Sequence, residues 1–376
     1  MTPKIERFLA EKQPQTPCLV VDLDVIAGNF RHWRATLPSV RVAYAVKANP
    51  ATEVVQMLDN LGSCFDAASI YEIDACLALG IAPDRIHYGS TVKKKADIAR
   101  AHDLGVRVFA FDSDAELAKL AEAAPGAGVY CRIAVPTEGA DWPLARKFGC
   151  SLESAHALML EARERGLDAS GISFHVGSQQ TIADQWRVAI ERAAFVIHGL
   201  AADGLTVRSL NLGGGFPIRY RNDVASLEEI AAVIDAAMAE HLGDMTLDLI
   251  AEPGRSIVGT AGAIESEVVL ISDKRFIDGR RWVYLDVGKF GGLSETIDEC
   301  IQYEIVVPER EGEVGPVVLA GPTCDSADIM YETARYDLPA DLRVGDKVRL
   351  LNTAAYTTTY ASTGFNGFPP LVEYYI

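Results

Sequence analysis

The chain has 376 residues, a formal net charge of −17, and 49% hydrophobic residues. This length exceeds the size at which a single hydrophobic core stops growing, so we expect one large domain with a second domain beside it. The acidic balance argues against a nucleic-acid-binding protein, because phosphate backbones are bound by basic surfaces. The composition is that of an ordinary folded enzyme.

Signals for export, membrane insertion and metal binding are weak. Residues 1–17 are polar and no apolar run is long enough to cross a bilayer, so we expect a cytoplasmic protein that does not enter the membrane. The seven cysteines are spread without Cys-x-x-Cys pairs, which fits neither a disulfide framework nor a zinc site, and we expect no metal. The basic run Lys93-Lys94-Lys95 is short, and we expect a solvated helix start there.

Strand-like and helix-like segments alternate between Arg41 and Arg255. Short β-branched runs separate segments such as Ser151–Gly166, whose apolar residues recur at three- and four-residue spacing. Repeated βα units predict a parallel sheet, and eight of them favour a closed (β/α)8 TIM barrel over an open doubly wound sheet. The expected strands are Val42–Lys47, Ser63–Ala67, Arg85–Gly89, Arg107–Phe111, Val129–Ala134, Gly171–Val176, Ser209–Leu212 and Leu247–Ala251.

After Arg255 the sequence changes to alternating strands with few convincing helices. Such a pattern predicts a C-terminal β-sandwich or barrel-like domain, which the early strand Cys18–Asp22 could join. We therefore expect an α/β barrel over residues 25–255 and a β domain made of residues 1–24 and 256–376. The candidate strands of the β domain are Ala263–Ser272, Arg281–Asp286, Gly315–Ala320 and Lys347–Asn352.

Two glycine-containing loops follow the seventh and eighth expected strands. Functional side chains of a (β/α)8 barrel gather at the C-terminal strand ends, and the loops after the last two strands often bind phosphate. The run Gly213-Gly214-Gly215 would let backbone N–H groups approach an anion, and Glu252-Pro253-Gly254-Arg255 offers a guanidinium for bidentate binding. A triple glycine alone more often marks a tight turn, but two such loops at neighbouring strand ends favour a phosphate site.

Lys47 ends the first expected strand. A lysine pointing into a barrel mouth is desolvated and can form a Schiff base, whereas the alternative is a side chain that reaches solvent from the strand end. A phosphate site and a reactive lysine in one barrel mouth indicate pyridoxal phosphate.

Further polar residues fall at strand ends, and each has an ordinary structural alternative. Glu252 could hold the proton on the pyridine nitrogen or form a buried ion pair with Arg255. His175 could stack on the cofactor ring, although a lone histidine is more often a core residue, and Ser178 could donate to phosphate. Asp66 and Glu72 follow another strand, but Glu72 could simply charge the first turn of a helix.

Together these motifs resemble the group of pyridoxal-phosphate enzymes with an alanine-racemase-like fold, which contains the eukaryotic and bacterial ornithine decarboxylases. The resemblance runs over nearly the whole chain, and the order of its motifs makes chance agreement implausible. Its most specific pieces are Ala45-Val46-Lys47-Ala48-Asn49, Ser173-Phe174-His175-Val176-Gly177-Ser178, Gly213-Gly214-Gly215-Phe216, Ala251-Glu252-Pro253-Gly254-Arg255 and Gly321-Pro322-Thr323-Cys324-Asp325-Ser326.

The resemblance implies roles for individual residues in cofactor binding. Lys47 would carry the cofactor, Glu252 would pair with the pyridine nitrogen and His175 would stack on the ring. The other positions that match residues around the cofactor are Asp66, Glu72, Arg132, Ser178, Gly213, Gly214, Gly215, Gly254, Arg255 and Tyr356.

The resemblance also implies a homodimer with shared active sites. Cys324 and Asp325 look like residues that reach the partner's site, where the thiol handles protonation at the substrate carbon and the carboxylate binds the distal amine. Taken alone, Cys324 would be read as a buried thiol. Phe365 resembles an aromatic residue of the same pocket. Lys147 and Asp328 match two residues that form an ion pair between the subunits in that family.

The expected reaction is pyridoxal-phosphate-dependent decarboxylation of L-ornithine to putrescine and CO2, with L-lysine to cadaverine as a further candidate. The segment around Ser294–Glu299 departs from the animal pattern, and we expect Asp298 or Glu299 to supply a second carboxylate for the substrate tail. Ornithine and lysine differ by one methylene, which typically discriminates by only about 1–3 kcal/mol.

Three alternatives stay open at this point. Diaminopimelate or arginine decarboxylases share the fold, but the diaminopimelate enzymes usually have glutamate where Asp325 follows Cys324. Racemases use a tyrosine and a lysine on opposite ring faces. A non-catalytic regulatory homologue is a third alternative, although both Lys47 and Cys324 are present.

Overall fold

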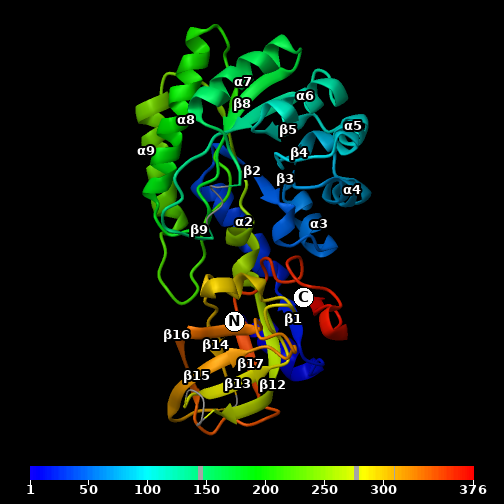
Figure 1. Cartoon of the computed structure of the whole chain (residues 1–376), viewed down its shortest axis with the longest axis vertical. Coiled ribbons are helices and arrows are strands. Elements are labelled where there is room, and N and C mark those ends of the chain that lie inside the picture. The colour runs from blue at the N-terminus through cyan, green and yellow to red at the C-terminus, as the bar shows by residue number, and fades with distance from the viewer. Residues whose placement is uncertain (143–146, 275–278, 309) are drawn as a thin grey trace. The chain divides into compact units, whose positions relative to one another are not determined.

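The computed structural model describes residues 1–142, 147–274, 279–308 and 310–376, which fall into two compact units (Figure 1). The barrel unit contains Ala27–Pro217 and Val224–Ile257. The β unit contains Met1–Ile26, Ile218–Asp223 and Val258–Ile376. The barrel unit therefore interrupts the β unit in the sequence.

Eight parallel strands of the barrel unit close into a barrel in the order β10, β11, β2, β3, β4, β5, β6 and β8. The expected (β/α)8 barrel and its eight strands are confirmed, with strand ends shifted by up to three residues. The strands are β2 Val40–Ala45, β3 Cys64–Ala67, β4 Ile86–Tyr88, β5 Val108–Phe111, β6 Gly128–Arg132, β8 Asp168–Ser173, β10 Ser209–Asn211 and β11 Asp248–Ala251. A separate antiparallel ribbon pairs β7 Ala140–Trp142 with β9 Ser178–Gln180.

Helices lie outside the barrel strands (Figure 1), and several begin at a serine cap. The expected helix Ser151–Gly166 is confirmed as α7, in which Ser151 Oγ accepts from Ser154 N, and Gly166 follows its end with a φ of +78°. Ser226 and Glu229 form a capping box at α9. The helices are α2 Leu23–Thr36, α3 Thr52–Asn60, α4 Ile70–Ala78, α5 Lys95–Asp103, α6 Asp114–Ala123, α7 Leu152–Glu164, α8 Asp184–Ala202, α9 Leu227–Leu242 and α10 Arg255–Val258, with 3-10 turns η1 Val46–Ala48 and η2 Pro83–Arg85.

Lys93 precedes α5 and is buried, so the expectation of a solvated run was wrong for this residue. Its side chain is 0% exposed and its Nζ lies 2.9 Å from Glu116 Oε1. The same ammonium donates to Ser90 O and Ala110 O at 2.7 and 2.6 Å. Burial lowers the pKa of Lys93 to about 8, and its partners provide the compensation that a buried charge requires.

The β unit is organised around the long strand β12, which pairs with different strands along its length. Its first half pairs with β1 and β17, and its second half pairs with β13. The strands are β1 Cys18–Val21, β12 Gly262–Asp273, β13 Arg281–Leu285, β14 Ile305–Val306, β15 Val314–Ala320, β16 Ile329–Pro339, β17 Lys347–Leu351 and β18 Val372–Tyr375, with 3-10 segments η3 Gly259–Ala261, η4 Ser294–Glu299 and η5 Phe365–Gly367. The four expected strands and β1 are confirmed, whereas β14, β16 and β18 were not predicted.

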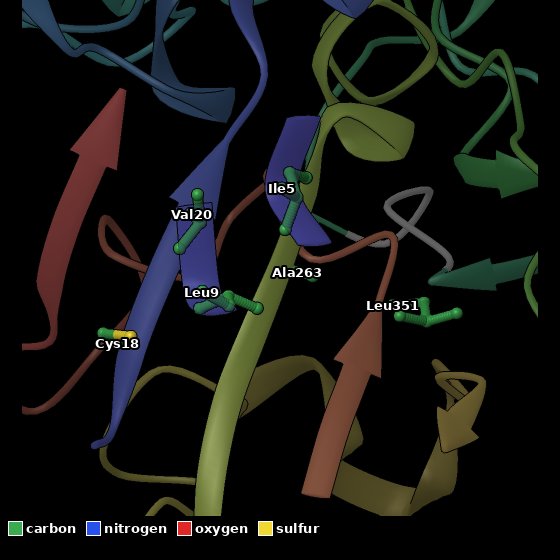
Figure 2. Packing of buried hydrophobic residues seen from close by; sticks show 6 residues of the cluster. All are labelled: Ile5, Leu9, Cys18, Val20, Ala263 and Leu351. Carbon is green, nitrogen blue, oxygen red and sulfur yellow. The ribbon is translucent and has the colours of Figure 1, made fainter. Parts of the chain in front are cut away.

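An N-terminal helix, α1 Pro3–Lys12, covers one part of this sheet (Figure 2). Its buried residues Ile5 and Leu9 pack on a cluster from β1, β12 and β17, made of Cys18, Val20, Ala263 and Leu351. Thr2 caps the helix by accepting from Ile5 N. Burial of this apolar face stabilises α1, which is too short to persist alone in water. None of the described helices is long and apolar enough to span a membrane.

Candidate active site

Lys47 lies in η1, just beyond the end of β2 at Ala45, so the strand is shorter than expected. The turn is held from two sides, because Tyr44 Oη donates to Asn49 O at 2.9 Å and Ala45 N donates to Pro253 O at 3.1 Å. The Lys47 side chain is 45% exposed, and its Nζ lies 3.5 Å from Asp66 Oδ2. The lysine is therefore accessible while a carboxylate from the neighbouring strand orients it.

Asp66 is a buried carboxylate on β3. It is 3% exposed, and its Oδ1 has no hydrogen-bond partner among the described residues. A Cβ on Gly89 would lie 1.8 Å from this oxygen, so the site requires glycine at the end of the next strand. A buried carboxylate with an unused oxygen favours a cation nearby.

Glu72 lies in the first turn of α4, and the charge of Lys47 acts on it. Its Oε2 accepts from Ala68 N at 2.7 Å, and Ser69 Oγ accepts from Glu72 N at 3.3 Å. Burial raises the pKa of Glu72, while the Ala68 N–H and the charge of Lys47 oppose the rise. The alternative of a charged residue in the first turn of a helix is therefore observed, and a role near the cofactor stays a prediction.

Glu252 follows β11 and has a strongly perturbed carboxyl group. Asn211 Nδ2 donates to its Oε1 at 2.5 Å, and Tyr130 Oη lies 3.5 Å from the same oxygen. Burial, together with the charge of Asp66, raises the pKa of Glu252 to about 7. The group can therefore take up or share a proton near neutral pH.

His175 lies two residues beyond β8 and is neutral. Gly177 N donates to its Nδ1 at 3.0 Å, so the ring proton must be on Nε2. Burial and the positive charges of Arg132 and Lys47 hold the pKa of His175 well below its usual range. A neutral, fixed imidazole has the properties that stacking on an aromatic ring requires.

The two candidate phosphate loops are tightly packed. Gly213 and Gly215 have φ values of +65° and +102°, and a Cβ on either would lie 2.1 or 2.2 Å from a backbone oxygen of the loop after β8. Arg255 is 3% exposed, and its Nη2 donates to Ser178 Oγ at 3.1 Å. A guanidinium and a hydroxyl thus lie together at the end of the barrel that carries the glycine run.

Arg132 and Gly254 complete the predicted positions of the barrel unit. Arg132 is the last residue of β6, and its guanidinium lies 4.9 Å from the centre of the Phe148 ring. Burial lowers the pKa of Arg132. Gly254 is buried directly before α10, where its carbonyl accepts from Ile257 N.

The remaining predicted residues belong to the β unit. Cys324 is exposed, which excludes the alternative of a buried thiol, and its backbone N donates to Asn366 Oδ1 at 2.9 Å. Asp325 is exposed in the same loop and accepts from Ala327 N. Phe365 packs on Phe290 with ring centres 4.7 Å apart. Tyr356 lies in this unit with a φ of +59°, and its role near the cofactor stays a prediction.

A cavity of about 490 Å³ lies in the β unit, and its lining includes Thr323 and Phe365. These residues neighbour the Cys324-Asp325 loop and its Asn366 partner. Space next to the predicted substrate residues is therefore already present within this unit.

Asp298 and Glu299 share a turn but have different environments. Both have positive φ values, 52° and 56°, a conformation that costs energy for residues other than glycine. Glu299 Oε1 accepts from Glu332 N and Thr333 N at 2.6 and 2.7 Å, and its Oε2 accepts from Ala334 N. Although burial acts in the opposite direction, these N–H donors hold the pKa of Glu299 below its usual value. Asp298 is exposed.

The family comparison agrees with this geometry. Residues 23–259 match the family model described as pyridoxal-dependent decarboxylase, pyridoxal binding domain. A lysine/ornithine decarboxylase of Selenomonas ruminantium is 34% identical over 370 residues, which cover 98% of this chain and 91% of that protein. The chain belongs to the pyridoxal-dependent decarboxylase family.

A solved structure and a further relative resemble the chain over at least 96% of its length. The solved structure of SrLDC, the Selenomonas ruminantium lysine decarboxylase, in complex with PLP and cadaverine has a TM-score of 0.88 and 33% identity and covers 100% of this chain and 93% of that one. Antizyme inhibitor 2 of Xenopus laevis is 33% identical over 374 residues, covering 96% of this chain and 81% of that protein. The family therefore includes a protein named for inhibition as well as enzymes.

The residues of the barrel mouth fit the cofactor of a pyridoxal-dependent decarboxylase. An accessible lysine, a neutral imidazole and a carboxyl with a raised pKa lie with a buried guanidinium and a glycine run. The unused buried oxygen of Asp66 adds negative charge for which a cationic group would compensate. These are the groups needed to bind an aldehyde, a pyridine nitrogen and a phosphate.

Sequence reasoning missed Asn211 and Tyr130, which contact Glu252. Asn211 ends β10, and its Oδ1 accepts from Gly213 N at 2.9 Å, so it fixes both the carboxyl and the glycine loop. An Asn-x-Gly sequence at the end of an expected barrel strand was a usable signal for such a turn. Tyr130 gave no such signal, because a tyrosine in a strand is common.

Proposed function

We propose that this protein catalyses the pyridoxal-phosphate-dependent decarboxylation of L-ornithine to putrescine and CO2, with L-lysine to cadaverine as a second reaction. The observation that carries the proposal is the set of groups at the barrel mouth, where Lys47 pairs with Asp66 and Glu252 has a pKa of about 7. Family membership supports decarboxylation, and the substrate is our inference from the residues of the β unit.

Each barrel residue has a proposed task. Lys47 would bind the cofactor covalently, and Asp66 would orient the amine of Lys47 before that bond forms. Glu252 would hold a proton at the pyridine nitrogen, and the neutral imidazole of His175 would cover one face of the ring. Bound pyridoxal phosphate supplies an electron sink for the electron pair left by departing CO2.

Phosphate binding would use both charge and backbone donors. Arg255 and Ser178, whose side chains contact each other, would donate to phosphate oxygens. The backbone N–H groups of Gly213, Gly214 and Gly215 would add neutral donors without steric hindrance.

We propose that the distal ammonium of the substrate is bound by Asp325 and Asp298. Glu299 is a poorer candidate, because three backbone N–H groups already occupy its carboxylate. Cys324 would return a proton to the substrate carbon after CO2 has left. An exposed thiol next to an exposed carboxylate supports these two roles.

In this proposal two copies of the chain form a homodimer, and the Cys324-Asp325 loop completes the site of the partner. This homodimer does not depend on the expected ion pair between Lys147 of one subunit and Asp328 of the other. The Asp328 side chain is 2% exposed and accepts from Lys289 N, Thr323 N and Thr323 Oγ1. Its hydrogen bonds support a structural role within its own chain.

The resemblance to antizyme inhibitor 2 keeps a regulatory, non-catalytic function as the second candidate. The presence of Lys47 and Cys324 favours the enzyme, because covalent cofactor binding and proton return each require a reactive side chain.

The test is release of CO2 from ornithine, lysine, arginine and diaminopimelate at matched concentrations, with and without added pyridoxal phosphate. We expect cofactor-dependent release that is fastest with ornithine. Faster release from lysine, arginine or diaminopimelate would overturn the substrate assignment, and racemisation without CO2 release would identify the other reaction of this fold. If the protein binds the cofactor but releases no CO2 from any of the four substrates, the result would favour the regulatory function.

A further inference from the structure

Two cysteines lie in contact on the outer side of the barrel strand that ends at Arg132. Cys131 Sγ and Cys150 Sγ are 3.6 Å apart, and both cysteines are free. Cys131 is fully buried in β6, whereas Cys150 is partly exposed. A disulfide would require these two sulfur atoms to approach to about 2 Å.

The backbone holds Cys150 against the end of β6, opposite a residue two positions after Cys131. Cys150 forms a parallel β-bridge with Ile133, in which Cys150 N donates to Arg132 O at 3.0 Å and Ala134 N donates to Cys150 O at 2.8 Å. Gly149 N donates to Asp112 Oδ2 at 2.8 Å. The segment around Cys150 is therefore anchored to β6 and to the loop after β5 before any covalent bond forms.

The two thiols are also chemically unequal. The contact with Cys131 lowers the pKa of Cys150, whereas the same contact and burial hold the pKa of Cys131 well above its usual range. The thiolate is the reactive form of cysteine, so Cys150 is the nucleophile of the pair. By contrast, burial raises the pKa of Cys18 and of Cys76 to about 12.

We propose that Cys131 and Cys150 form a redox modification site, at which hydrogen peroxide converts the two thiols into an intrachain disulfide. This inference is independent of the proposed substrate and of the decarboxylation reaction. It concerns the outer face of β6 and uses none of the residues assigned to the cofactor.

The chemistry balances with peroxide as the oxidant. Cys150 thiolate attacks one peroxide oxygen, so that an S–O bond forms, the O–O bond breaks and the departing hydroxide is protonated to water. Cys131 then attacks the sulfenic sulfur of Cys150, an S–S bond forms, and the hydroxyl leaves with the thiol proton as a second water. Two thiols lose two electrons and two protons in total, and a dithiol reductant reverses the change.

Oxidation would act on the end of β6. Arg132 lies directly after Cys131, its carbonyl accepts from Cys150 N, and its guanidinium lies over Phe148. A disulfide would therefore join the residue before Arg132 covalently to the segment that donates to the Arg132 carbonyl.

The test uses peptide mapping of the folded, cofactor-loaded protein carrying Cys324→Ser, because the exposed Cys324 would itself react with peroxide. The folded protein is treated with hydrogen peroxide, the peroxide is removed, the protein is denatured in the presence of iodoacetamide so that buried thiols are blocked as well, and it is then cut with trypsin. Cleavage after Lys119, Arg132, Lys147 and Arg163 separates the two cysteines into peptides 120–132 and 148–163. We expect these peptides to be linked, with the loss of two hydrogens, and to separate after reduction.

Matched variants give the control. Cys150→Ser should abolish the linked peptide, whereas Cys64→Ser, which removes another partly exposed thiol, should leave it unchanged. If Cys150→Ser fails to fold, the protein with both cysteines still decides the question, because peroxide must then abolish iodoacetamide labelling of both. Separate alkylation of Cys131 and Cys150 after peroxide, or sulfinic acid at Cys150 without linkage, would overturn the proposal.

Discussion

Asn211 Nδ2 lies 2.5 Å from Glu252 Oε1, which joins the ends of the neighbouring strands β10 and β11. The amide fixes a carboxyl whose pKa burial and Asp66 raise to about 7. An unfolded glutamate has a pKa of about 4.3, so the folded cofactor-free protein binds more protons than the unfolded chain between these values. The contribution of Glu252 to stability is therefore greatest below about pH 4.3 and is lost as the pH rises toward 7.

The corresponding prediction compares Glu252→Gln with the unchanged protein, both without cofactor. Relative to the variant, the unchanged protein should lose up to about 3 kcal/mol of unfolding free energy between pH 4.5 and 7. Urea unfolding at several pH values measures the difference. The buried His87, whose pKa is lowered to about 4, contributes to both proteins and cancels. A difference that does not change with pH would contradict the proposed environment of Glu252.

Replacement of Lys47 tests covalent cofactor binding. Lys47→Arg keeps a cation next to Asp66 but removes the nucleophilic amine, so we expect turnover to fall by at least about a hundredfold with no loss of folded structure. Lys95→Arg, on the exposed start of α5, should retain activity. Carbon dioxide release and circular dichroism of the three proteins separate a chemical defect from a folding defect.

Cofactor affinity should depend on the contact between Ser178 and Arg255. Charge-assisted hydrogen bonds are stronger than neutral ones, so Arg255→Met should weaken pyridoxal phosphate binding by about 10–100-fold and Ser178→Ala by about 2–10-fold. Titration of the cofactor-free protein gives both values. Arg208→Met, which removes an exposed ion pair with Asp168, is the control, and an equal loss there would refute the assignment.

The two carboxylates of the η4 turn should respond differently to neutralisation. Glu299→Gln weakens three hydrogen bonds to the backbone of β16, so it should destabilise the protein by about 1–3 kcal/mol. Asp298→Asn should leave the unfolding midpoint unchanged and raise the KM for ornithine. Measurement of both quantities for both variants decides between an anchoring and a substrate-binding role, and the reverse pattern would assign the substrate to Glu299.

Two neighbouring lysines should differ in their effect on stability. Lys93→Met removes a buried charge and leaves Ser90 O and Ala110 O without their donor, so we expect a loss of about 3 kcal/mol or more. Lys95→Met breaks an exposed ion pair with Glu122 and should cost less than about 1 kcal/mol. Urea unfolding midpoints compare the two variants, and equal shifts would show that the Lys93 network adds nothing.

Periodicity in the sequence was sufficient to predict the barrel, because each short apolar run precedes an amphipathic helix. It did not predict β16, which alternates poorly in burial and contains the charged residues Glu332, Arg335 and Asp337. Helix α1 was missed because its segment is polar on average, and only Ile5 and Leu9 show its buried face.

For the candidate site, the sequence indicated which strand ends carry the polar residues but not what each side chain contacts. Glu299 and Asp298 are adjacent carboxylates in the sequence, and only the fold of β16 next to the turn distinguishes an anchored group from an exposed one. Similarly, Lys93 was indistinguishable from Lys95 until tertiary packing placed Glu116 and two carbonyls around its ammonium. Such differences arise from contacts between distant segments, which local patterns do not encode.

Strand β1 pairs with β12 and with the last strand β18, and Ile376 N donates to Val21 O. During synthesis, β1 therefore stays unpaired until the entire barrel has been translated, because β12 and β18 follow the barrel in the sequence. Domains generally fold as units during synthesis, so the barrel can close first while the edge of β1 is still open. An open edge invites pairing with other chains. Translation arrested before Val372 would release a closed barrel with an incomplete sheet, a form prone to aggregation.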